Sequence, residues 1–529
     1  MSIYLTGFLF YNINNGCITV KNNNEVVMML DKIKQNGLTK EQCAEQVEKL
    51  RARLTSLEKR IKDENLPVII TIDGWSASGK GSQIAQLIKC LDPRFYKVMS
   101  FGKPNEVERR KPWLWRFACA MPMQGNFLIL DRSWYRDTAN AYLYDEIGKS
   151  EMRQRFDDIN VFERQLADDG YLIVKFFLHI TEEEQKKRIK KLMSSDYTSW
   201  RIDEHDLYNL KKREKFTKYY EEMITKTNTP SGVWNVIGAD DNKNWAKLEM
   251  LRVLVEAIEG RLEAKTLGKN FVVNNQFDFA DVKPEIFEME KTPKVSETAL
   301  DKTLTDEEYE HQLEKCQDRL FKLQNLCYQK KIPVVICYEG WDAAGKGGNI
   351  RRVANALDPR GYEVEPIAAP DKYELARHYL YRFWIRLEND GHFTIFDRTW
   401  YGRVMVEPIE NITAQDRVDQ AYQEINEFEK LLIEWGAVVI KFWINIDKDE
   451  QLKRFELRQN TPEKQWKITD EDWRNREKWD TYEKYIDTMI EKTSTKQAPW
   501  TIVEGNDKKY ARIKAMKTII DAIEKRLAE

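Results

Sequence analysis

The chain has 529 residues, which is enough for two to four domains. Charged residues make up 33% of it, but the net charge is only -2, which excludes the overall basic excess typical of nucleic-acid-binding proteins. A polyanionic ligand would therefore need a local basic patch. No apolar stretch is long enough to span a membrane, and seven scattered cysteines without a CxxC pair predict a reduced, cytoplasmic protein.

Residues 1–27 mix aromatic residues, Asn and Gly without a clear period and lack the regions of a signal peptide. Because Met28 could serve as a second start site, we expect these residues to be an extension outside the domains, which an upstream-start artefact would explain. From Leu38 to Ile61, apolar residues recur at three- and four-residue spacings and predict a charged helix. The apolar run 66–72 then predicts a buried strand that leads into a glycine-rich stretch, 74–82.

The two halves of the chain are copies of one unit. Gly74 and Gly340 lie 266 positions apart, and the same offset aligns Asp131–Tyr135 with Asp397–Tyr401. A constant offset without gaps indicates tandem duplication of a unit of about 230 residues, not a solenoid. The predicted divisions are an extension at 1–27, a first domain at 28–263, a linker at 264–300 and a second domain at 301–529.

Each unit alternates short apolar runs with longer amphipathic segments, which predicts a parallel sheet covered by helices on both faces. In the second unit the predicted strands are 332–338, 393–396, 437–444 and 500–503, with a closing helix at 508–529. Ligands of such sheets bind at the carboxyl ends of the strands. Asp342 and Asp397 both follow apolar runs, so we expect them at that edge.

The stretch 340–348, Gly-Trp-Asp-Ala-Ala-Gly-Lys-Gly-Gly, follows a predicted strand and precedes a predicted helix, which is the setting of a phosphate-binding loop. Backbone N–H groups and the helix start would meet phosphate oxygens, and Lys346 would reach the outer phosphates. A glycine turn with a surface lysine is the alternative. The loop residues expected to bind phosphate are Gly340, Ala343, Ala344, Gly345, Gly347 and Gly348.

The loop departs from its usual form at Gly347, where Ser or Thr would normally touch Mg²⁺. Asp342 could supply a metal-binding oxygen instead, because a carboxylate beside phosphates is repelled unless a cation lies between them. Asp342 is therefore predicted to bind a metal or to handle a proton, and the residues leave both roles open.

Asp397 has the position of a Walker-B-type Mg²⁺ ligand, and Arg398 and Arg403 could clamp phosphate oxygens. The alternative is a structural cap in which Asp397 pairs with Arg398. We predict Asp342 and Asp397 as metal ligands and Lys346, Arg398 and Arg403 as further catalytic residues.

Arg454 and Arg458 share one face of a predicted helix that ends at Thr461-Pro462, and Lys467 follows. Arginine-bearing lids close over the phosphoryl group in nucleotide kinases, whereas the alternative is a solvated face paired with nearby glutamates. The aromatic-rich segment 373–384 predicts one amphipathic helix. Its Arg382 could face the site, although helical phase does not decide this.

These motifs resemble the polyphosphate kinase 2 family. The resemblance covers about residues 38–263 and 304–529, and the tandem arrangement is similar to the two-domain class, the polyphosphate:AMP phosphotransferases. The residues that carry it are 340–347, Leu357–Arg360, 397–403 with Glu407, and Arg454 and Arg458 with Trp466-Lys467.

The resemblance implies tandem P-loop kinase domains of α/β class, each a thymidylate-kinase-like sheet with a helical lid. It implies transfer of a terminal phosphoryl group from inorganic polyphosphate to a nucleoside monophosphate, chiefly AMP, with Mg²⁺, and a nucleotide site that includes Arg382 and Glu407. A long anion needs a basic groove. The candidates are Arg351, Arg352, Arg403, Arg454, Arg458 and Lys467.

The first unit departs from this pattern, although Lys80 and Asp131 remain. Its replacements are Ser76 for Asp342, Asp137 for Arg403, Leu192 for Arg458 and Gln86 for Arg352. We expect the second unit to be the catalyst and the first to support folding or assembly, or to hold polyphosphate. The alternative is a working first unit whose metal is held by Asp131 alone.

Two other functions stay open at this level. An ATP-dependent small-molecule or nucleotide kinase is disfavoured by the missing Ser or Thr after Lys346. A non-catalytic polyphosphate- or nucleotide-binding regulator predicts loss of charged site residues in both units, whereas the second unit retains them. Two fused units could mimic a dimer and could pair further into a homo-oligomer; no nucleic-acid or membrane partner is expected.

Overall fold

The computed structural model describes residues 30, 33, 38–240, 243–267 and 275–529. The chain forms two compact units: unit 1 consists of residues up to Pro104 and Ala120–Lys283, and unit 2 of Asn105–Cys119 and Pro284–Glu529. The predicted extension at 1–27 lies outside the described residues. None of the helices in the described part of the chain is long and apolar enough to cross a membrane.

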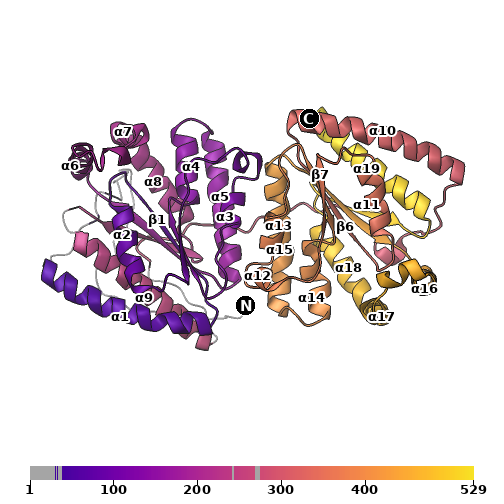
Figure 1. Cartoon of the computed structure of the whole chain (residues 1–529), viewed down its shortest axis with the longest axis horizontal. Helices are drawn as coiled ribbons and strands as arrows, with labels where there is room; N and C mark the ends of the chain where they lie inside the picture. The colour runs from indigo at the N-terminus through magenta and orange to yellow at the C-terminus, as the bar shows by residue number, and fades with distance from the viewer. Residues whose placement is uncertain (1–29, 31–32, 34–37, 241–242, 268–274) are drawn as a thin grey trace, which may run out of the picture. The chain divides into compact units, whose positions relative to one another are not determined.

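Each unit contains a five-stranded parallel sheet flanked by helices, which confirms the predicted fold class (Figure 1). The strand order is β2-β3-β1-β4-β5 in unit 1 and β7-β8-β6-β9-β10 in unit 2. The strands of unit 1 are β1 (Val68–Gly74), β2 (Tyr96–Ser100), β3 (Phe127–Asp131), β4 (Leu172–His179) and β5 (Gly232–Gly238). Those of unit 2 are β6 (Val334–Gly340), β7 (Tyr362–Pro366), β8 (Phe393–Asp397), β9 (Val438–Asn445) and β10 (Trp500–Glu504).

The helices of unit 1 are α1 (Lys40–Asp63), α2 (Lys80–Leu87), α4 (Trp134–Leu143), α5 (Lys149–Asp168), α6 (Glu182–Met193), α7 (Glu204–Lys211), α8 (Arg213–Thr227) and α9 (Lys243–Leu267). Those of unit 2 are α3 (Trp115–Ala118), α10 (Asp306–Lys330), α11 (Lys346–Ala354), α12 (Lys372–Leu375), α13 (Tyr381–Trp384), α14 (Val406–Ile409), α15 (Gln415–Glu434), α16 (Lys448–Gln459), α17 (Asp470–Glu477), α18 (Trp479–Thr493) and α19 (Lys508–Ala528). In Figure 1, α10 and α19 lie side by side in unit 2, as α1 and α9 do in unit 1.

The predicted strands of unit 2 are present, and the structure adds β7 at the edge of the sheet. The sequence analysis missed β7 because an edge strand needs no continuous apolar run: its residues Tyr-Glu-Val-Glu-Pro are exposed or half-buried. The single helix predicted at 373–384 is wrong. The chain forms the short helices α12 and α13 there, and the Asp371 carboxylate caps the first by accepting from the amides of Tyr373 and Glu374.

A buried ion pair crosses the core of unit 2. The Lys441 ammonium, on β9, lies 2.8 Å from Oε2 of Glu429, on α15, and both side chains are essentially inaccessible to solvent. Lys441 also donates to the Tyr401 hydroxyl and to the Thr493 carbonyl, at 3.0 and 2.6 Å. Because all its donors are engaged, the charge is tolerated in an apolar interior. The matching residues of unit 1, Lys175 and Glu163, form the same pair at 2.8 Å.

We expect Lys441→Met to lower the free energy of unfolding of unit 2 by about 3–5 kcal/mol, because it leaves the Glu429 carboxylate buried without its cation. Urea denaturation followed by tryptophan fluorescence measures the change. The double variant Lys441→Met/Glu429→Gln removes both charges and should recover most of the loss. A double variant as unstable as the single one would contradict this reading.

Candidate active site

The glycine-rich loop of unit 2 joins the central strand β6 to α11. Gly340 has a φ of 150°, and an added Cβ there would lie 2.5 Å from the Ile444 carbonyl oxygen. Gly345, which precedes α11, has a φ of 111°, and Ala343 adopts a φ of 61°. These left-handed conformations turn the chain sharply at the carboxyl end of the sheet, where glycine is the least strained residue. The loop is therefore built as predicted for a phosphate-binding turn.

Lys346 is the first residue of α11, and its ammonium folds back across the loop. It donates to the carbonyls of Gly340 and Trp341, at 2.6 and 3.2 Å. These contacts hold the positive charge over the turn, next to the N-terminal end of a helix. Both features attract an anion.

Asp342 lies within the loop and is only 16% exposed. Its Oδ2 accepts a hydrogen bond of 2.9 Å from the Asn475 amide, on α17, and its Oδ1 lies 3.6 Å from the Arg398 guanidinium. The carboxylate thus connects the loop to α17 and to the segment after β8. A small cavity of about 80 Å³ is lined here by Asp342, Lys346, Arg398, Gly402 and Asn475, among others.

Asp397 ends β8, beside Tyr338 of the central strand. The backbone then turns through Arg398, whose φ is 67° and whose amide donates to the Tyr338 carbonyl at 3.0 Å. Among the described residues, no donor hydrogen-bonds the Asp397 carboxylate. Asp342 and Asp397 are thus placed at the same edge of the sheet, as predicted.

Asp342 and Asp397 supply carboxylate oxygens, the donors that magnesium prefers, at one edge of the sheet. No group of three or more His, Cys, Asp or Glu side chains in the described part of the chain is arranged to hold a metal. Magnesium, however, commonly binds through one or two carboxylates and completes its shell with water and substrate phosphates. Asp397 offers unengaged oxygens, and Asp342 lies beside the lysine that would meet phosphate.

Glu339 is a site residue that the sequence analysis missed. It is 3% exposed, and its Oε1 accepts from the amide and the hydroxyl of Thr399, at 2.7 and 2.8 Å. Burial raises the pKa of its carboxyl group, while Lys346 and Thr399 oppose the shift. The available signal was an acid immediately before the first loop glycine, which Asp73 repeats in unit 1. Glu339 ties the loop to the segment that follows Asp397.

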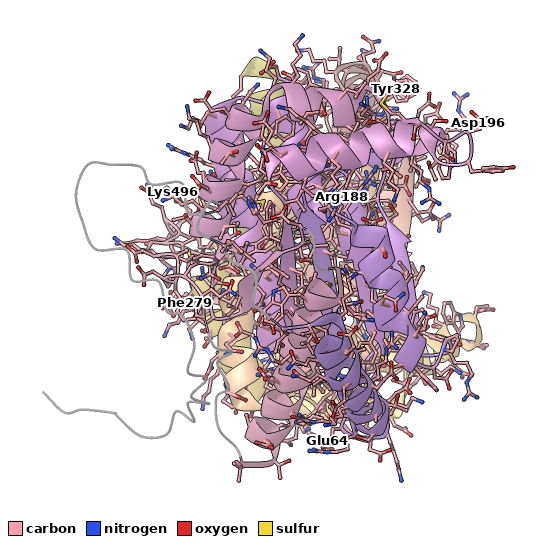
Figure 2. The ribbon with its side chains drawn as sticks, turned by 90° about the vertical axis from the view of Figure 1, so that its left-hand side faces the viewer. Glu64, Arg188, Asp196, Phe279, Tyr328 and Lys496 are labelled. Carbon is pink, nitrogen blue, oxygen red and sulfur yellow. The ribbon has the colours of Figure 1, made fainter. Side chains whose placement is uncertain are left out.

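Arg454 occupies a different place from the predicted lid position. It is 5% exposed, and its Nη1 donates to the carbonyls of Ala343 and Ala344, at 3.1 and 2.8 Å. Its Nη2 donates to Gly505 and Asn506, at 2.7 and 3.0 Å. The guanidinium fork thus fastens the loop to the end of β10, so in this structure Arg454 positions the loop. Arg188 (labelled in Figure 2) contacts the loop of unit 1 in the same way, with Nη1 3.0 Å from the Ser78 carbonyl.

Three residues of the predicted nucleotide and phosphate sites form a second cluster. Arg403 lies 2.8 Å from Glu407 and above the ring of Tyr379, 4.4 Å from its centre. Arg382 is 9% exposed, contacts Glu374 at 3.3 Å, and has an Nε without a hydrogen-bond partner. Burial lowers the pKa of Arg382, and the charges of Glu374 and Glu407 oppose that shift. An anion entering this cluster would find donors that the protein leaves partly unsatisfied.

The outer basic residues include two that the sequence analysis missed. Arg351 is exposed and Arg352 half-buried on α11, and Arg458 is half-buried on α16; the Lys467 side chain lies outside the described residues. Arg512, on α19, is so close to the loop that an added Cβ at Gly348 would lie 3.5 Å from its Nη2. Burial lowers the pKa of Lys508, at the start of α19, and nearby Arg454, Arg512 and Lys464 lower it further.

These α19 residues complete the local basic patch that a polyanion requires. A comparison of the two units at the offset of 266 positions could have found them, because Lys508 and Arg512 of unit 2 are replaced by the uncharged Asn242 and Ala246 in unit 1. Motif spacing alone does not find them, since only the sheet order brings α19 beside α11.

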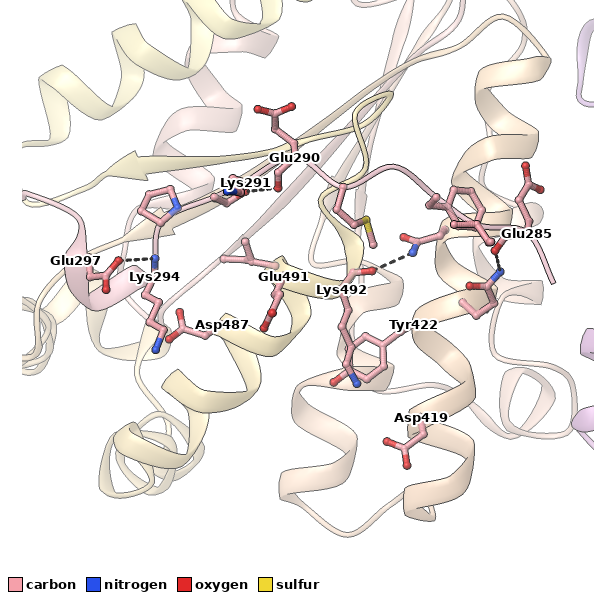
Figure 3. Close-up of a pocket in the computed structure, with 18 residues that line it drawn as sticks. Glu285, Glu290, Lys291, Lys294, Glu297, Asp419, Tyr422, Asp487, Glu491 and Lys492 are labelled. Atoms are coloured by element: carbon pink, nitrogen blue, oxygen red, sulfur yellow. Dashed lines mark hydrogen bonds between the residues drawn. The ribbon is translucent and has the colours of Figure 1, made fainter. Parts of the chain in front are cut away.

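A larger cavity of unit 2, about 1050 Å³, lies elsewhere (Figure 3). The segment Glu285–Glu297 forms one wall, with α15 and α18 opposite. The segment is fastened by Lys430, which lies 2.5 Å from Glu285, and by the Val295 amide, which donates to Asp487. This cavity shares no lining residue with the loop, so we do not place the reaction there.

A parallel sheet with a phosphate-binding loop after its central strand and an acid at the end of the neighbouring strand defines a P-loop kinase fold. A family model described as polyphosphate kinase 2 matches residues 37–266 and 303–529. The chain belongs to the polyphosphate kinase 2 family and is a phosphotransferase.

Several relatives cover nearly the whole chain. A protein of Pseudomonas aeruginosa named polyphosphate:AMP phosphotransferase is 38% identical, over 92% of this chain and 97% of its own length. A protein of the same name from Acinetobacter johnsonii is 33% identical, over 89% and 94%. A crystal structure of a polyphosphate kinase 2 from Pseudomonas aeruginosa superposes with a TM-score of 0.79 at 36% identity, covering 93% of this chain and 98% of that one.

We expect Arg454→Lys to lower kcat by about tenfold or more, because an ammonium cannot replace a planar fork that bonds four carbonyls. Steady-state kinetics of the purified chain measure the loss, and Arg188→Lys in unit 1 is the matched control, which should stay within about twofold. If Arg454 acted as a simple charge on phosphate, the lysine would preserve most of the activity.

Proposed function

We propose that unit 2 transfers the terminal phosphoryl group of inorganic polyphosphate to a nucleoside monophosphate, with AMP as the main acceptor, giving ADP. The observation that carries this proposal is that Asp342, Lys346 and Arg398 line one cavity at the carboxyl edge of the sheet, where Asp397 ends the neighbouring strand. The names of the relatives support the donor and the acceptor.

Phosphoryl transfer between two polyanions depends on positioning and on spreading negative charge. Lys346 and the loop amides would hold the donor phosphates, and Arg398 would stabilise charge on the transferring group. Arg382 and Arg403, with Glu407, would orient the acceptor phosphate. An acceptor oxygen then bonds to the terminal phosphorus as the bond to the bridging oxygen breaks, and the shortened polyphosphate leaves with that oxygen.

Asp342 and Asp397 would hold Mg²⁺, which would supply positive charge that neutralises the phosphates. Arg351, Arg352, Arg458, Lys508 and Arg512 would accompany the rest of the chain of phosphates as a basic track. The free thiols of the six described cysteines support a cytoplasmic setting for this reaction.

The test uses the purified full chain with Mg²⁺, AMP and long-chain polyphosphate, and it measures ADP by chromatography. We expect ADP to form in proportion to polyphosphate consumed and not to form when polyphosphate is omitted. Product from ATP and another acceptor, without any ADP from polyphosphate and AMP, would overturn the proposal.

The division of labour between the units has its own test. Asp342→Asn should lower turnover by about a thousandfold, because it removes a carboxylate from the metal and phosphate site while keeping its shape. Ser76→Ala, at the matching position of unit 1, should leave the rate of ADP formation nearly unchanged. Equal losses from the two substitutions would show that both units catalyse.

A further inference from the structure

The loop of unit 1 keeps the geometry of a phosphate site although its surroundings have changed. Ala77 and Gly79 have φ values of 60° and 98°, close to the values at the matching positions of unit 2. Lys80, the first residue of α2, donates to the carbonyls of Gly74 and Trp75, at 3.2 and 3.0 Å. The backbone that would meet phosphate is therefore retained.

Two substitutions add positive charge next to the loop lysine of unit 1, whereas the outer positions of the basic patch lose it. Ser76 replaces Asp342, which removes a negative charge, and Arg136 replaces Gly402, which adds a positive one. Arg136 donates to the Tyr220 hydroxyl at 3.1 Å and interacts electrostatically with both Asp73 and Lys80. The Tyr220 ring packs edge-on against Trp75 of the loop, with 5.0 Å between the ring centres, so the guanidinium lies close to the loop, and Gly402 lines the corresponding cavity in unit 2.

The loss of the carboxylate also leaves buried donors without an acceptor. In unit 2 the Asn475 amide donates to Asp342. In unit 1 the matching side chains, Asn209 and Ser76, are 0% and 4% exposed; the Ser76 hydroxyl has no hydrogen-bond partner, and the Asn209 amide nitrogen has only the Tyr220 hydroxyl beside it. The buried Ser78 hydroxyl of the same loop has none either. Unsatisfied buried donors are rare, because each costs free energy until an acceptor arrives.

We propose that unit 1 is a metal-independent binding site for a chain of phosphates, either inorganic polyphosphate or the phosphate tail of a nucleotide. A phosphate oxygen takes the place of the missing carboxylate and accepts from Ser76 and Asn209. Arg136 supplies the positive charge that a divalent cation is expected to supply in unit 2. No transfer occurs at this site, since no carboxylate stands in the loop and Arg136 extends from the position of Gly402. The proposal does not depend on turnover by unit 2.

The test measures tripolyphosphate binding to the full chain in EDTA by isothermal titration calorimetry. Every chain in this titration also carries Lys346→Ala, which disables the loop of unit 2. We expect binding to persist in EDTA, and we expect Lys80→Ala or Arg136→Gly to weaken it at least tenfold. The matched control is Arg153→Ala, which removes the same charge from an exposed pair with Glu222 on unit 1 and should change nothing. Binding that is absent in EDTA, or unaffected by both loop-site variants, would overturn the proposal.

A second experiment looks for a gain of binding in unit 2, which a misfolded chain could not produce. Asp342→Ser combined with Gly402→Arg gives unit 2 the two features of unit 1, in a chain whose own unit 1 site is disabled by Lys80→Ala. We expect this chain to gain tripolyphosphate binding in EDTA and to form no ADP. The absence of such a gain, in a chain that still unfolds cooperatively, would count against the role of Arg136.

A parallel titration with ATP identifies the source of the phosphates. Affinity for ATP equal to that for tripolyphosphate supports a site for any phosphate tail. At least tenfold tighter binding of tripolyphosphate supports a site for inorganic polyphosphate. Binding of orthophosphate as tight as that of tripolyphosphate would contradict recognition of a chain.

Discussion

The buried pair of Lys441 and Glu429 is the constraint on which the site of unit 2 depends. Glu429 accepts from Lys441, from the Tyr401 hydroxyl at 2.5 Å and from the Trp400 indole at 3.1 Å. Trp400 and Tyr401 begin three residues after Asp397, so the core fixes the path of the chain that carries Asp397, Arg398 and Arg403. Because charges in an apolar interior tolerate little displacement, this segment is held more rigidly than its surface position suggests.

The same pair explains how the two units can share a scaffold and differ in chemistry. Glu163 in unit 1 accepts from Lys175, Tyr135 and Trp134 just as its counterpart does. The buried pair is therefore the same in both units, although the segment after it differs: unit 1 continues as the helix α4, whereas unit 2 forms a tighter turn at 400–404 before α14. The substitutions Ser76 and Arg136 change the charge beside a loop whose backbone is the same in both units.

The sequence analysis predicted those features whose signal lies within a few neighbouring residues. The loop 340–348, Asp397 after its strand and the closing helix each carry their signal within a few residues. By contrast, the role of Arg454 depends on carbonyls about 110 and 51 positions away, and Arg512 reaches the loop only through the order of strands. Glu339 was missed because a buried acid inside an apolar run belongs to no known motif. The helices α12 and α13 were predicted as one because the chain leaves helical geometry between them, at 376–380, where the His378 ring accepts from the Leu380 amide.

One copy of a duplicated site can lose its catalytic residues and still keep its ability to bind the ligand. A catalytic phosphate site must tolerate excess negative charge until a cation arrives, because the acids that hold the metal repel phosphate without it. Replacing one acid and adding one arginine removes that requirement and leaves the loop, the lysine and the helix start in place. On this proposal Ser76 and Arg136 both prevent transfer in unit 1 and favour retention of the anion. If unit 1 binds without reacting, it holds a long phosphate chain without consuming it, whereas unit 2 would shorten the chain at each turnover.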